Sequence, residues 1–481
     1  MSWGKMSDKR ELDKRESDEI EKELLPNHQA DMVFECLECG KTYHIDQFLY
    51  TCPECKSLLK IRDRNFDRLM KVPGEQWRRI FNSRKMLNRE SLKGIFLFYE
   101  LILPCIPLED IIYLGEGHTP LVRANEDLAG LIGTEFFIKY DGLNPSASFK
   151  DRGMASAVSF INYSIRKRNI TQLLGICAST GDTSAAAALY LSYLKKGVVR
   201  SVVLLPQGKV TPQQLSQPLG SGATVIEVPG VFDDCMKIVE ELSENYEVFL
   251  LNSKNPVRIM GQKSYSYEVA QQMDFDTKDL VVVVPIGNAG NVTAIMEGFI
   301  DLYRLKIIPE LPRIIGVQSH HANPVFLWYQ DKHYQPVKVR PSVAQAAMIG
   351  DPVSFPKVSQ LVCAHFQDRF FAVEVTEQEI MEQMLEANRH GHVVCTQGGE
   401  SLAGVKEALK KGFIRRGQKV VVDSTSHQLK FSGFQQMYFE NKFPQEYEII
   451  PRTPLQNHPV QLPASALQIA NYLNLQKKMV V

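Results

Sequence analysis

Short apolar runs recur through the middle of the chain, and segments with helical spacing of apolar residues separate them. The clearest run is Val-Val-Val-Val at residues 281–284, which a proline and a glycine-rich stretch follow. Apolar runs of this length between turn residues are typical of buried strands, and their regular alternation with helices favours an open α/β fold with mostly parallel sheets. We expect strands at residues 136–140, 173–177, 201–205, 224–228, 248–251, 280–285, 313–317, 370–375 and 419–423, with helices between them, among them 183–195, 232–245, 291–305 and 376–389.

The composition is that of a globular protein with more than one domain. The chain has 481 residues, of which 44% are hydrophobic and 23% charged, and Lys+Arg and Asp+Glu both number 55. No overall charge therefore attracts nucleic acid or an anionic membrane. The highly charged first 30 residues lack the apolar core of a signal peptide, and apolar runs such as residues 94–104 are too short to span a bilayer. We therefore expect neither a nucleic-acid nor a membrane partner.

Four of the nine cysteines form two Cys-x-x-Cys pairs. Cys36 pairs with Cys39 and Cys52 with Cys55, and twelve residues separate the two pairs. Tetrahedral zinc takes four thiolates from two such pairs, so the spacing predicts a structural zinc ribbon with no open coordination position. A ribbon without metal, an iron site and a redox Cys-x-x-Cys pair are the alternatives. The other five cysteines are scattered singly, which fits a reducing cytoplasm.

A polar, proline-containing loop precedes Lys150, and a helical run of small residues follows it. The loop and first turn read Asn-Pro-Ser-Ala-Ser-Phe-Lys-Asp-Arg-Gly at residues 144–153, so the lysine lies at or near a helix N-terminus. The positive end of the helix dipole disfavours an ammonium group, and an amine that loses its proton readily is a nucleophile. One interpretation is a Schiff-base lysine that holds pyridoxal phosphate. The other is an ordinary surface lysine that opens a helix.

Three further loops follow predicted strands and open helices, where ligands bind in open α/β folds. Residues 178–184 offer hydroxyl and amide groups that suit a carboxylate. Residues 285–293 carry glycines that let the backbone approach a phosphate, but they match neither a dinucleotide fingerprint nor a P-loop. Residues 423–431 offer hydroxyls that could face a heteroaromatic nitrogen. For the first and third loops, plain helix capping is the alternative.

Lys209 and Arg258 indicate a second anion site, because each lies on a loop after a predicted strand. One phosphate site would serve the cofactor, and two more cations would be superfluous for the dehydration of serine or threonine. Arginine binds phosphate through several planar contacts, and lysine offers a point charge. The two residues therefore favour a phosphorylated substrate, the alternative being two surface charges.

Together these segments resemble the fold-type II pyridoxal-phosphate enzymes, and within them the threonine synthase family. The order and spacing of the motifs agree from about residue 113 to 435, and some family members carry a zinc-ribbon-like N-terminal segment. The resemblance implies two open, mostly parallel α/β sheet domains. The matching pieces are residues 115–121, 148–153, 178–184, 205–210, 252–258, 287–291 and 424–427.

The resemblance also implies a role for each site residue. Lys150 would form the Schiff base and move protons, and Thr425 would face the pyridine nitrogen. Asp182 stands where many members have asparagine near the ring's 3'-oxygen, while Ser426 and Gln428 stand where alanine and glycine are common. The cofactor phosphate would bind to Gly287, Asn288, Ala289, Gly290 and Asn291, the substrate carboxylate to Ser179, Thr180 and Thr183, and the substrate phosphate to Lys209, Ser253, Asn255 and Arg258.

The chain is expected to divide into five parts, with a smaller α/β subdomain at about 155–255 inserted in the larger one. The parts are a charged, poorly ordered N-terminus (1–30), a zinc-ribbon-like segment (31–65), a helical connector (66–112), the catalytic region (113–440) and a tail that packs on the large subdomain (441–481).

The activity that the resemblance implies is conversion of O-phospho-L-homoserine and water to L-threonine and phosphate. A cysteate-synthase-like replacement on O-phosphoserine and a dehydratase are the enzymatic alternatives. A catalytically silent homologue that binds ligands is the non-enzymatic one. The family further implies a homodimer, and the cysteine usage a cytoplasmic protein.

Overall fold

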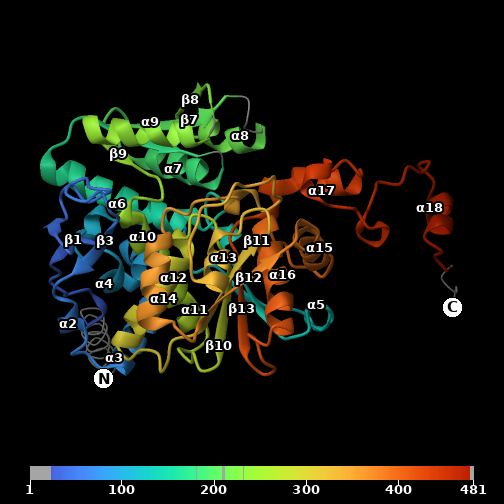
Figure 1. Cartoon of the computed structure of the whole chain (residues 1–481), viewed down its shortest axis with the longest axis horizontal. Helices are drawn as coiled ribbons and strands as arrows, with labels where there is room; N and C mark the ends of the chain where they lie inside the picture. The colour runs from blue at the N-terminus through green and yellow to red at the C-terminus, as the bar shows by residue number, and fades with distance from the viewer. Residues whose placement is uncertain (1–22, 180, 208–211, 231, 477–481) are drawn as a thin grey trace, which may run out of the picture.

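The structure is a computed structural model that describes residues 23–179, 181–207, 212–230 and 232–476. Most of the charged N-terminal stretch lies outside the described residues, as do Thr180 and Lys209. The described chain forms three sheets of three, six and four strands, with helices packed around the two larger ones (Figure 1). The predicted α/β fold class is confirmed.

The sequence pattern located the main elements well. All nine predicted strands and the four named helices are present, with ends within two residues of the prediction. The strands are β1 Met32–Cys36, β2 Thr42–His44, β3 Leu59–Asp63, β4 Leu121–Arg123, β5 Phe137–Tyr140, β6 Leu173–Ala178, β7 Val199–Pro206, β8 Thr224–Val228, β9 Val248–Leu250, β10 Leu280–Pro285, β11 Arg313–Ser319, β12 Phe370–Val375 and β13 Lys419–Ser424. The α-helices are α2 Phe66–Leu69, α3 Gly74–Arg84, α4 Tyr99–Ile102, α5 Glu126–Ile132, α6 Lys150–Arg168, α7 Asp182–Tyr193, α8 Pro212–Gly220, α9 Phe232–Asn245, α10 Pro256–Gln262, α11 Ser264–Gln272, α12 Gly290–Arg304, α13 Pro324–Asp331, α14 Phe355–His365, α15 Glu377–Arg389, α16 Thr396–Lys410, α17 Ser432–Phe439 and α18 Ala466–Tyr472. Short 3-10 helices are η1 Glu90–Leu92, η2 Gly94–Phe98, η3 Leu108–Asp110, η4 Asp141–Leu143, η5 Gln345–Ala347, η6 Gln428–Phe431, η7 Gln445–Tyr447 and η8 Thr453–Leu455.

The six-stranded sheet has the order β12-β11-β10-β13-β5-β4. Its strands are parallel except at the β4–β5 edge, which is antiparallel. Val282 of β10 lies opposite Ile314 of β11 and Val421 of β13. Because neighbouring parallel strands end at the same edge, the loops after β5, β10 and β13 lie close together there.

Strand β10 is buried along its whole length, since helices cover both faces of the sheet. Val281 and Val283 pack into one core with residues of α5, α15 and α16, while Val282 and Val284 pack into the other with residues of α6, α11 and α12. Successive side chains of a strand point to opposite faces. A continuous apolar run is what such a two-sided position requires.

The four-stranded sheet has the order β8-β7-β6-β9 and is parallel throughout. Val239 of α9 packs on one face, beside Ile176 and Val202. Helix α7 covers the other face, and Figure 1 shows this unit at the top of the view. The predicted subdomain at about 155–255 contains the same strands, and its boundaries stay a prediction.

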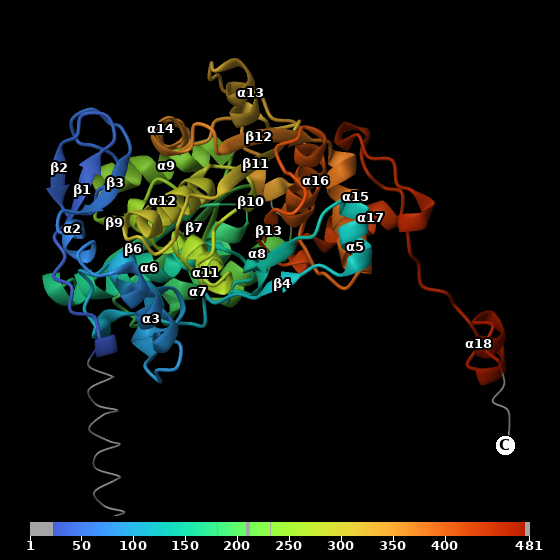
Figure 2. The ribbon, with the colours of Figure 1, turned by 90° about the horizontal axis from the view of Figure 1, so that it is seen from below.

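The N-terminal antiparallel sheet, β2-β1-β3, packs on the main body. Phe34 of β1 is fully buried, and it belongs to the same hydrophobic core as Val282 and Val284 on one face of the six-stranded sheet. The Tyr50 hydroxyl accepts a hydrogen bond from the Leu250 N–H (2.8 Å) and donates one to the Val248 carbonyl (3.3 Å), so it holds the segment to β9. Figure 2 shows this sheet at one end of the molecule and α18 at the other.

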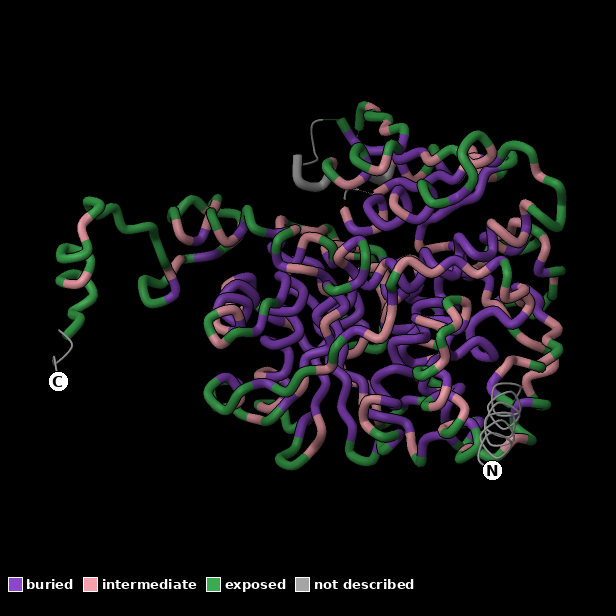
Figure 3. The backbone as a smooth tube through the Cα atoms, turned by 180° about the vertical axis from the view of Figure 1, so that it is seen from behind, coloured by how far each residue is buried: buried purple, intermediate pink, exposed green. Residues whose placement is uncertain are grey.

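The C-terminal segment packs on the large sheet unit only in part. Ile449 and Leu455 are buried in its core. None of residues 456–476 is buried, and Figure 3 shows this stretch leading away from the body as a largely exposed arm. In the described part of the chain, no helix has both the length and the apolar character needed to cross a membrane.

Candidate active site

Lys150 is the first residue of α6, as the sequence predicted. Its Nζ lies 4.2 Å from the centroid of the Phe149 ring. Removal from water lowers the pKa of Lys150 to about 7, and the charges of Arg258 and Lys430 act in the same direction. A lysine with this pKa is a competent nucleophile and proton acceptor near neutral pH.

The loop that carries Lys150 runs beside the loop that carries Thr425. The Phe149 N–H donates to the Thr425 carbonyl (2.8 Å), and the His427 N–H donates to the Ala147 carbonyl (3.1 Å). The two loops form an antiparallel bridge between these bonds. Backbone contacts therefore fix the lysine next to the end of β13, although the two segments are far apart in sequence.

A buried charge network anchors the first turn of α6. Arg152 forms ion pairs with Asp141 (2.7 Å) and Glu268 (2.6 Å), and Lys139 pairs with Glu268 (2.8 Å). All four side chains are buried, and two cations balance two carboxylates. Because Arg152 lies two residues after Lys150, this network restricts the position of the lysine-bearing turn.

The loop after β10 forms a backbone cradle. Ala289 has a left-handed backbone (φ 61°), and α12 begins at Gly290. A Cβ on Gly287 would lie 3.0 Å from Ala347 Cα and 3.1 Å from the Ala346 carbonyl oxygen, so any other residue would require the neighbouring backbone to shift by a few tenths of an ångström. The Asn291 side chain is used elsewhere, since its amide donates to Asp423 (2.8 Å). The N-terminus of α12, rather than that side chain, offers donors to an anion.

One pocket joins most of the predicted site residues. It encloses about 600 Å³ of empty space, part of it open to solvent. Two segments that the sequence interpretation left without a role also contribute, namely residues 346–347 and Gln397 at the start of α16. The predicted site residues that line the pocket are Lys150, Ser253, Arg258, Gly287, Asn288, Ala289, Gly290, Asn291 and Thr425.

Arg258 is a buried cation in the wall of this pocket. Only 1% of its surface is exposed, and its Nη1 donates to the Leu251 carbonyl (2.9 Å) while its Nε has no hydrogen-bond partner. No carboxylate in the described part of the chain forms an ion pair with it. Burial lowers the pKa of Arg258 to about 10. A desolvated guanidinium without a counter-ion is suited to bind an anionic ligand.

Among the described residues, no side chain caps the first turn of α7. Its N-cap residue is Gly181, whose own N–H donates to Ser179 Oγ (3.2 Å), and Thr180 lies outside the described residues, so carboxylate binding by this loop stays a prediction. Asp182 lies in the first turn, where its carboxylate accepts hydrogen bonds from Ser426 (2.5 Å) and from Lys430 (2.8 Å). The aspartate therefore faces the end of β13 as a member of an ion pair.

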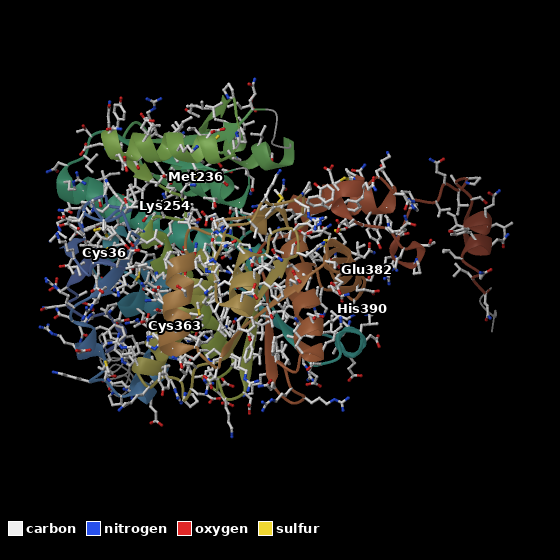
Figure 4. All side chains as sticks on the ribbon, viewed as in Figure 1. Cys36, Met236, Lys254, Cys363, Glu382 and His390 are labelled. Atoms are coloured by element: carbon white, nitrogen blue, oxygen red, sulfur yellow. The ribbon has the colours of Figure 1, made fainter. Side chains whose placement is uncertain are left out.

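The remaining predicted residues are placed less directly. Ser179 and Thr183 flank the start of α7 but do not line the pocket, and Thr180 and Lys209 lie outside the described residues. The Asn255 side chain caps α10 through the Val257 N–H (2.9 Å) and donates to a backbone carbonyl. Its neighbour Lys254, labelled in Figure 4, forms a partly exposed ion pair with Glu240 of α9 (2.6 Å), and such pairs contribute little to stability.

Sequence reasoning missed two buried amide side chains in the pocket wall. Gln262 has an unpartnered Oε1, and both amide atoms of Gln397 are unpartnered. Gln397 belongs to a Thr-Gln-Gly-Gly helix start, which resembles the other ligand loops in composition and could have been found on that ground. Gln262 lies inside a helix and gave no such signal.

The pocket fits pyridoxal phosphate. The glycine cradle offers close backbone approach for a phosphate, Lys150 offers an amine with a lowered pKa, and Thr425 offers a hydroxyl on the same wall. The unpartnered buried atoms of Gln262 and Gln397 further indicate that a polar ligand belongs here.

The four N-terminal cysteines also converge. Their sulfur atoms lie within 4.8 Å of one another, with Cys36 and Cys55 at 3.4 Å and Cys39 and Cys52 at 3.7 Å. Four thiolates at a zinc–sulfur distance of about 2.3 Å would be about 3.8 Å apart in a tetrahedron. The donor set is therefore compatible with zinc, and Figure 4 shows Cys36 at the edge of the molecule, far from α15 and α16.

Comparison with known proteins agrees with this geometry. Residues 112–425 match the family model described as "Pyridoxal-phosphate dependent enzyme". The chain belongs to this family. The matched range contains every predicted cofactor and substrate residue, whereas the N-terminal cysteines lie outside it.

Within the family, the chain is similar to threonine synthases. It is 37% identical over 402 residues to the threonine synthase of Methanocaldococcus jannaschii, covering 83% of this chain and 93% of that protein. It is 34% identical to "Threonine synthase 2, chloroplastic" of Arabidopsis thaliana, covering 82% of this chain and 75% of that one. The solved threonine synthase of Escherichia coli has the same fold, with a TM-score of 0.64 at 18% identity over 92% of this chain and 99% of that chain.

Proposed function

We propose that the protein converts O-phospho-L-homoserine and water to L-threonine and phosphate. The observation that carries the proposal is Arg258, a buried guanidinium in the pocket wall without a carboxylate partner in the described chain. The cradle at residues 287–291 already offers one anion site, which the cofactor phosphate would use. A second anion site in the same pocket therefore favours a phosphorylated amino acid over serine or threonine.

The substrate would be held at both of its anionic ends. Arg258 and Ser253 line the pocket and would bind the phosphate, with Lys209 as a further predicted contact. The start of α7, with Ser179, Thr180 and Thr183, would bind the carboxylate through its N–H groups and hydroxyls. Asn255 would act through the shape of the loop, because its amide is used to cap α10.

Lys150 would hold the cofactor covalently and move protons at the substrate's α-carbon. Bound pyridoxal phosphate supplies the electron sink that makes this proton removable. The lowered pKa of Lys150, about 7, leaves its amine free to accept the proton. Thr425 would face the ring nitrogen, since it lies on the pocket wall beside the lysine loop.

Asp182 would border the ring's 3'-oxygen as an ion pair and not as a lone carboxylate. Lys430 and Ser426 both donate to it. The pair has no net charge, so the repulsion expected between a carboxylate and a phenolate is removed.

Product analysis tests the substrate assignment. The full-length, cofactor-loaded protein is incubated with O-phospho-L-homoserine or O-phospho-L-serine, and phosphate and amino acids are measured. Equal amounts of threonine and phosphate from the first compound support the proposal. Phosphate from O-phosphoserine alone would favour a cysteate-synthase-like enzyme, and a keto acid with ammonia from serine or threonine would favour a dehydratase.

Replacement of the lysine separates an enzyme from a silent homologue. Lys150→Ala should leave the thermal unfolding midpoint close to that of the wild type but remove the visible absorbance of the Schiff base and the turnover. Lys254→Ala, on a neighbouring loop and paired with Glu240, is the matched control and should keep both. Near wild-type turnover of Lys150→Ala, or a wild type that takes up no cofactor, would contradict the proposal.

We further propose a structural zinc ion on Cys36, Cys39, Cys52 and Cys55, and a homodimer in the cytoplasm without nucleic-acid or membrane partners. The sulfur distances support the zinc, the scattered remaining cysteines support the cytoplasm, and the balanced charge supports the absence of nucleic-acid and membrane partners. The homodimer rests on the family resemblance alone. Metal analysis of undialysed protein and sedimentation velocity test these statements. Less than half an equivalent of zinc per chain counts against the ribbon zinc.

A further inference from the structure

Two adjacent histidines and a glutamate meet outside the active-site pocket. His320 and His321 directly follow β11, and Glu448 follows η7 in the C-terminal segment. One ligand atom of each side chain lies within 4.8 Å of the other two. None of the three residues lines the pocket around Lys150.

The surroundings set both imidazoles so that Nε2 faces the glutamate. His321 Nδ1 lies 2.5 Å from the Pro341 carbonyl and 3.7 Å from Glu377, and both of these groups are acceptors. His320 Nδ1 lies 3.3 Å from the Val375 carbonyl. For His321, this places the proton on Nδ1 and the lone pair on Nε2. His320 has an acceptor at each ring nitrogen, since its Nε2 also bonds to Glu448 Oε2 (2.9 Å), and a metal ion on this Nε2 would replace its proton. A backbone carbonyl on the far nitrogen is the usual support of a metal-ligating histidine.

His321 Nε2 is the second, independent observation. The His321 side chain has no exposed surface, and its Nε2 has no hydrogen-bond partner although Glu448 Oε2 lies 3.4 Å away. Buried ring nitrogens are normally satisfied, and this one has only a long contact of 3.4 Å to a carboxylate oxygen, which would be an ion pair if the ring were protonated. An acceptor nitrogen and a carboxylate facing each other need a cation or a proton between them.

We propose that His320 Nε2, His321 Nε2 and Glu448 Oε2 bind a divalent transition-metal ion of the zinc class. Two imidazoles and one carboxylate are a ligand set that zinc accepts, with water in the fourth position. Ligands at about 2.0–2.1 Å from zinc are about 3.3 Å apart in a tetrahedron. The observed separations from Glu448 Oε2, 2.9 Å to His320 and 3.4 Å to His321, are within a few tenths of an ångström of that spacing.

Arg340 orients the glutamate and does not occupy the site. Its Nη1 donates to Glu448 Oε1 (2.5 Å), which leaves Oε2 for the histidines. A guanidinium on the far oxygen of a ligating carboxylate fixes its direction in the same way as the carbonyls fix the imidazoles. Thus each of the three ligand side chains is oriented by a second group of the protein: the two imidazoles by backbone carbonyls and the carboxylate by Arg340.

The ion would connect the C-terminal segment to the pocket wall. The His321 carbonyl accepts from the Arg340 N–H (3.0 Å), at the start of the loop that leads to Ala346 and Ala347 in the pocket. Glu448 lies between Tyr447 and Ile449, both of which pack on the core of the large sheet unit. Metal binding would therefore stabilise both the tail and one wall of the pocket.

Metal content and thermal stability of the full-length, cofactor-loaded protein test the site. Wild type, Glu448→Gln and His320→Gln are compared with Glu446→Gln, which removes the same charge from an exposed residue two positions away. Each protein is equilibrated with excess zinc chloride, desalted and analysed for zinc. Thermal unfolding is measured before and after zinc is added.

Wild type and Glu446→Gln should retain one zinc per chain more than Glu448→Gln and His320→Gln, and zinc should raise the unfolding midpoint of the first two only. When Cys52→Ser is added to each protein, the difference of one zinc per chain should remain, because the cysteine cluster is separate from the histidine site. Equal zinc content in all variants overturns the proposal. A lower midpoint of Glu448→Gln without zinc, together with no effect of zinc on the wild type, also overturns it and leaves only an ion pair at this place.

Discussion

Replacement of Arg258 by glutamine should affect stability and activity in opposite directions. Burial lowers the pKa of Arg258 from 12.5 to about 10, which corresponds to about 3 kcal/mol against the charged form in the absence of an anion. Glutamine removes the cost of burying the charge, and it also removes the single hydrogen bond to Leu251, which contributes about 1 kcal/mol. The free energy of unfolding of Arg258→Gln should therefore equal or exceed that of the wild type.

Catalysis should suffer, because the substrate phosphate loses its charged partner. Truncating one member of a buried charge pair costs about 2–5 kcal/mol, so kcat/KM for O-phospho-L-homoserine should fall by roughly 30-fold to several thousand-fold. Inorganic phosphate, as a product, should also inhibit Arg258→Gln less than the wild type. Lys254→Gln is the matched control, since this lysine is on the same loop region but is paired with Glu240.

Steady-state phosphate release and thermal unfolding measure the two effects on the same preparations. A variant that is clearly less stable than wild type would show that Arg258 has a structural counter-charge. A stable variant with unchanged kcat/KM would show that the substrate anion does not reach Arg258. Either result refutes the argument from the unpaired guanidinium.

Four further outcomes follow from the same structure. In cofactor-free protein, the rate of Schiff-base formation with pyridoxal phosphate should rise with pH through about 7, the lowered pKa of Lys150, and an inflection near the ordinary 10.5 would contradict this. The unfolded chain keeps that proton up to about 10.5, so the free energy of unfolding of the cofactor-free protein should also rise with pH between the two values. Arg152→Met leaves two buried carboxylates with one cation fewer and should lower the free energy of unfolding in urea by about 3–5 kcal/mol, whereas a loss below about 1 kcal/mol would show that the network relaxes. Cys52→Ser should remove one zinc per chain and raise KM for O-phospho-L-homoserine, because Tyr50 connects this segment to β9 and the substrate loop, while the exposed Cys363→Ser, labelled in Figure 4, should change neither.

The sequence predicted elements best where burial is two-sided. Strand β10 was located to the residue, because four consecutive β-branched residues between turn residues favour a short strand covered on both faces. The C-terminal segment gives no such signal. Ile449 and Leu455 are buried whereas Leu467 in α18 is exposed, and apolar content alone does not reveal which surface a segment will meet.

Within the site, local motifs were predictable and distant pairings were not. Lys150 and Gly287 carry their signal in neighbouring residues, namely a helix start and a glycine-rich turn. The hydrogen bond from Lys430 to Asp182 joins residues 248 positions apart, and the hydrogen bond from Asn291 to Asp423 joins residues 132 positions apart. Such contacts depend on the order of strands in the sheet, which the pattern of a single chain does not contain.

Tyr50 also has a consequence for solubility. Strand β9 is an outer strand of the four-stranded sheet, and an outer strand presents free N–H and C=O groups with which another chain can pair. One hydroxyl engages a donor and an acceptor of β9 at once, two residues before a cysteine of the candidate zinc set. The cysteine-rich segment thus covers an edge at which another chain could pair. If the four cysteines bind zinc as proposed, removal of the ion should promote aggregation through this edge.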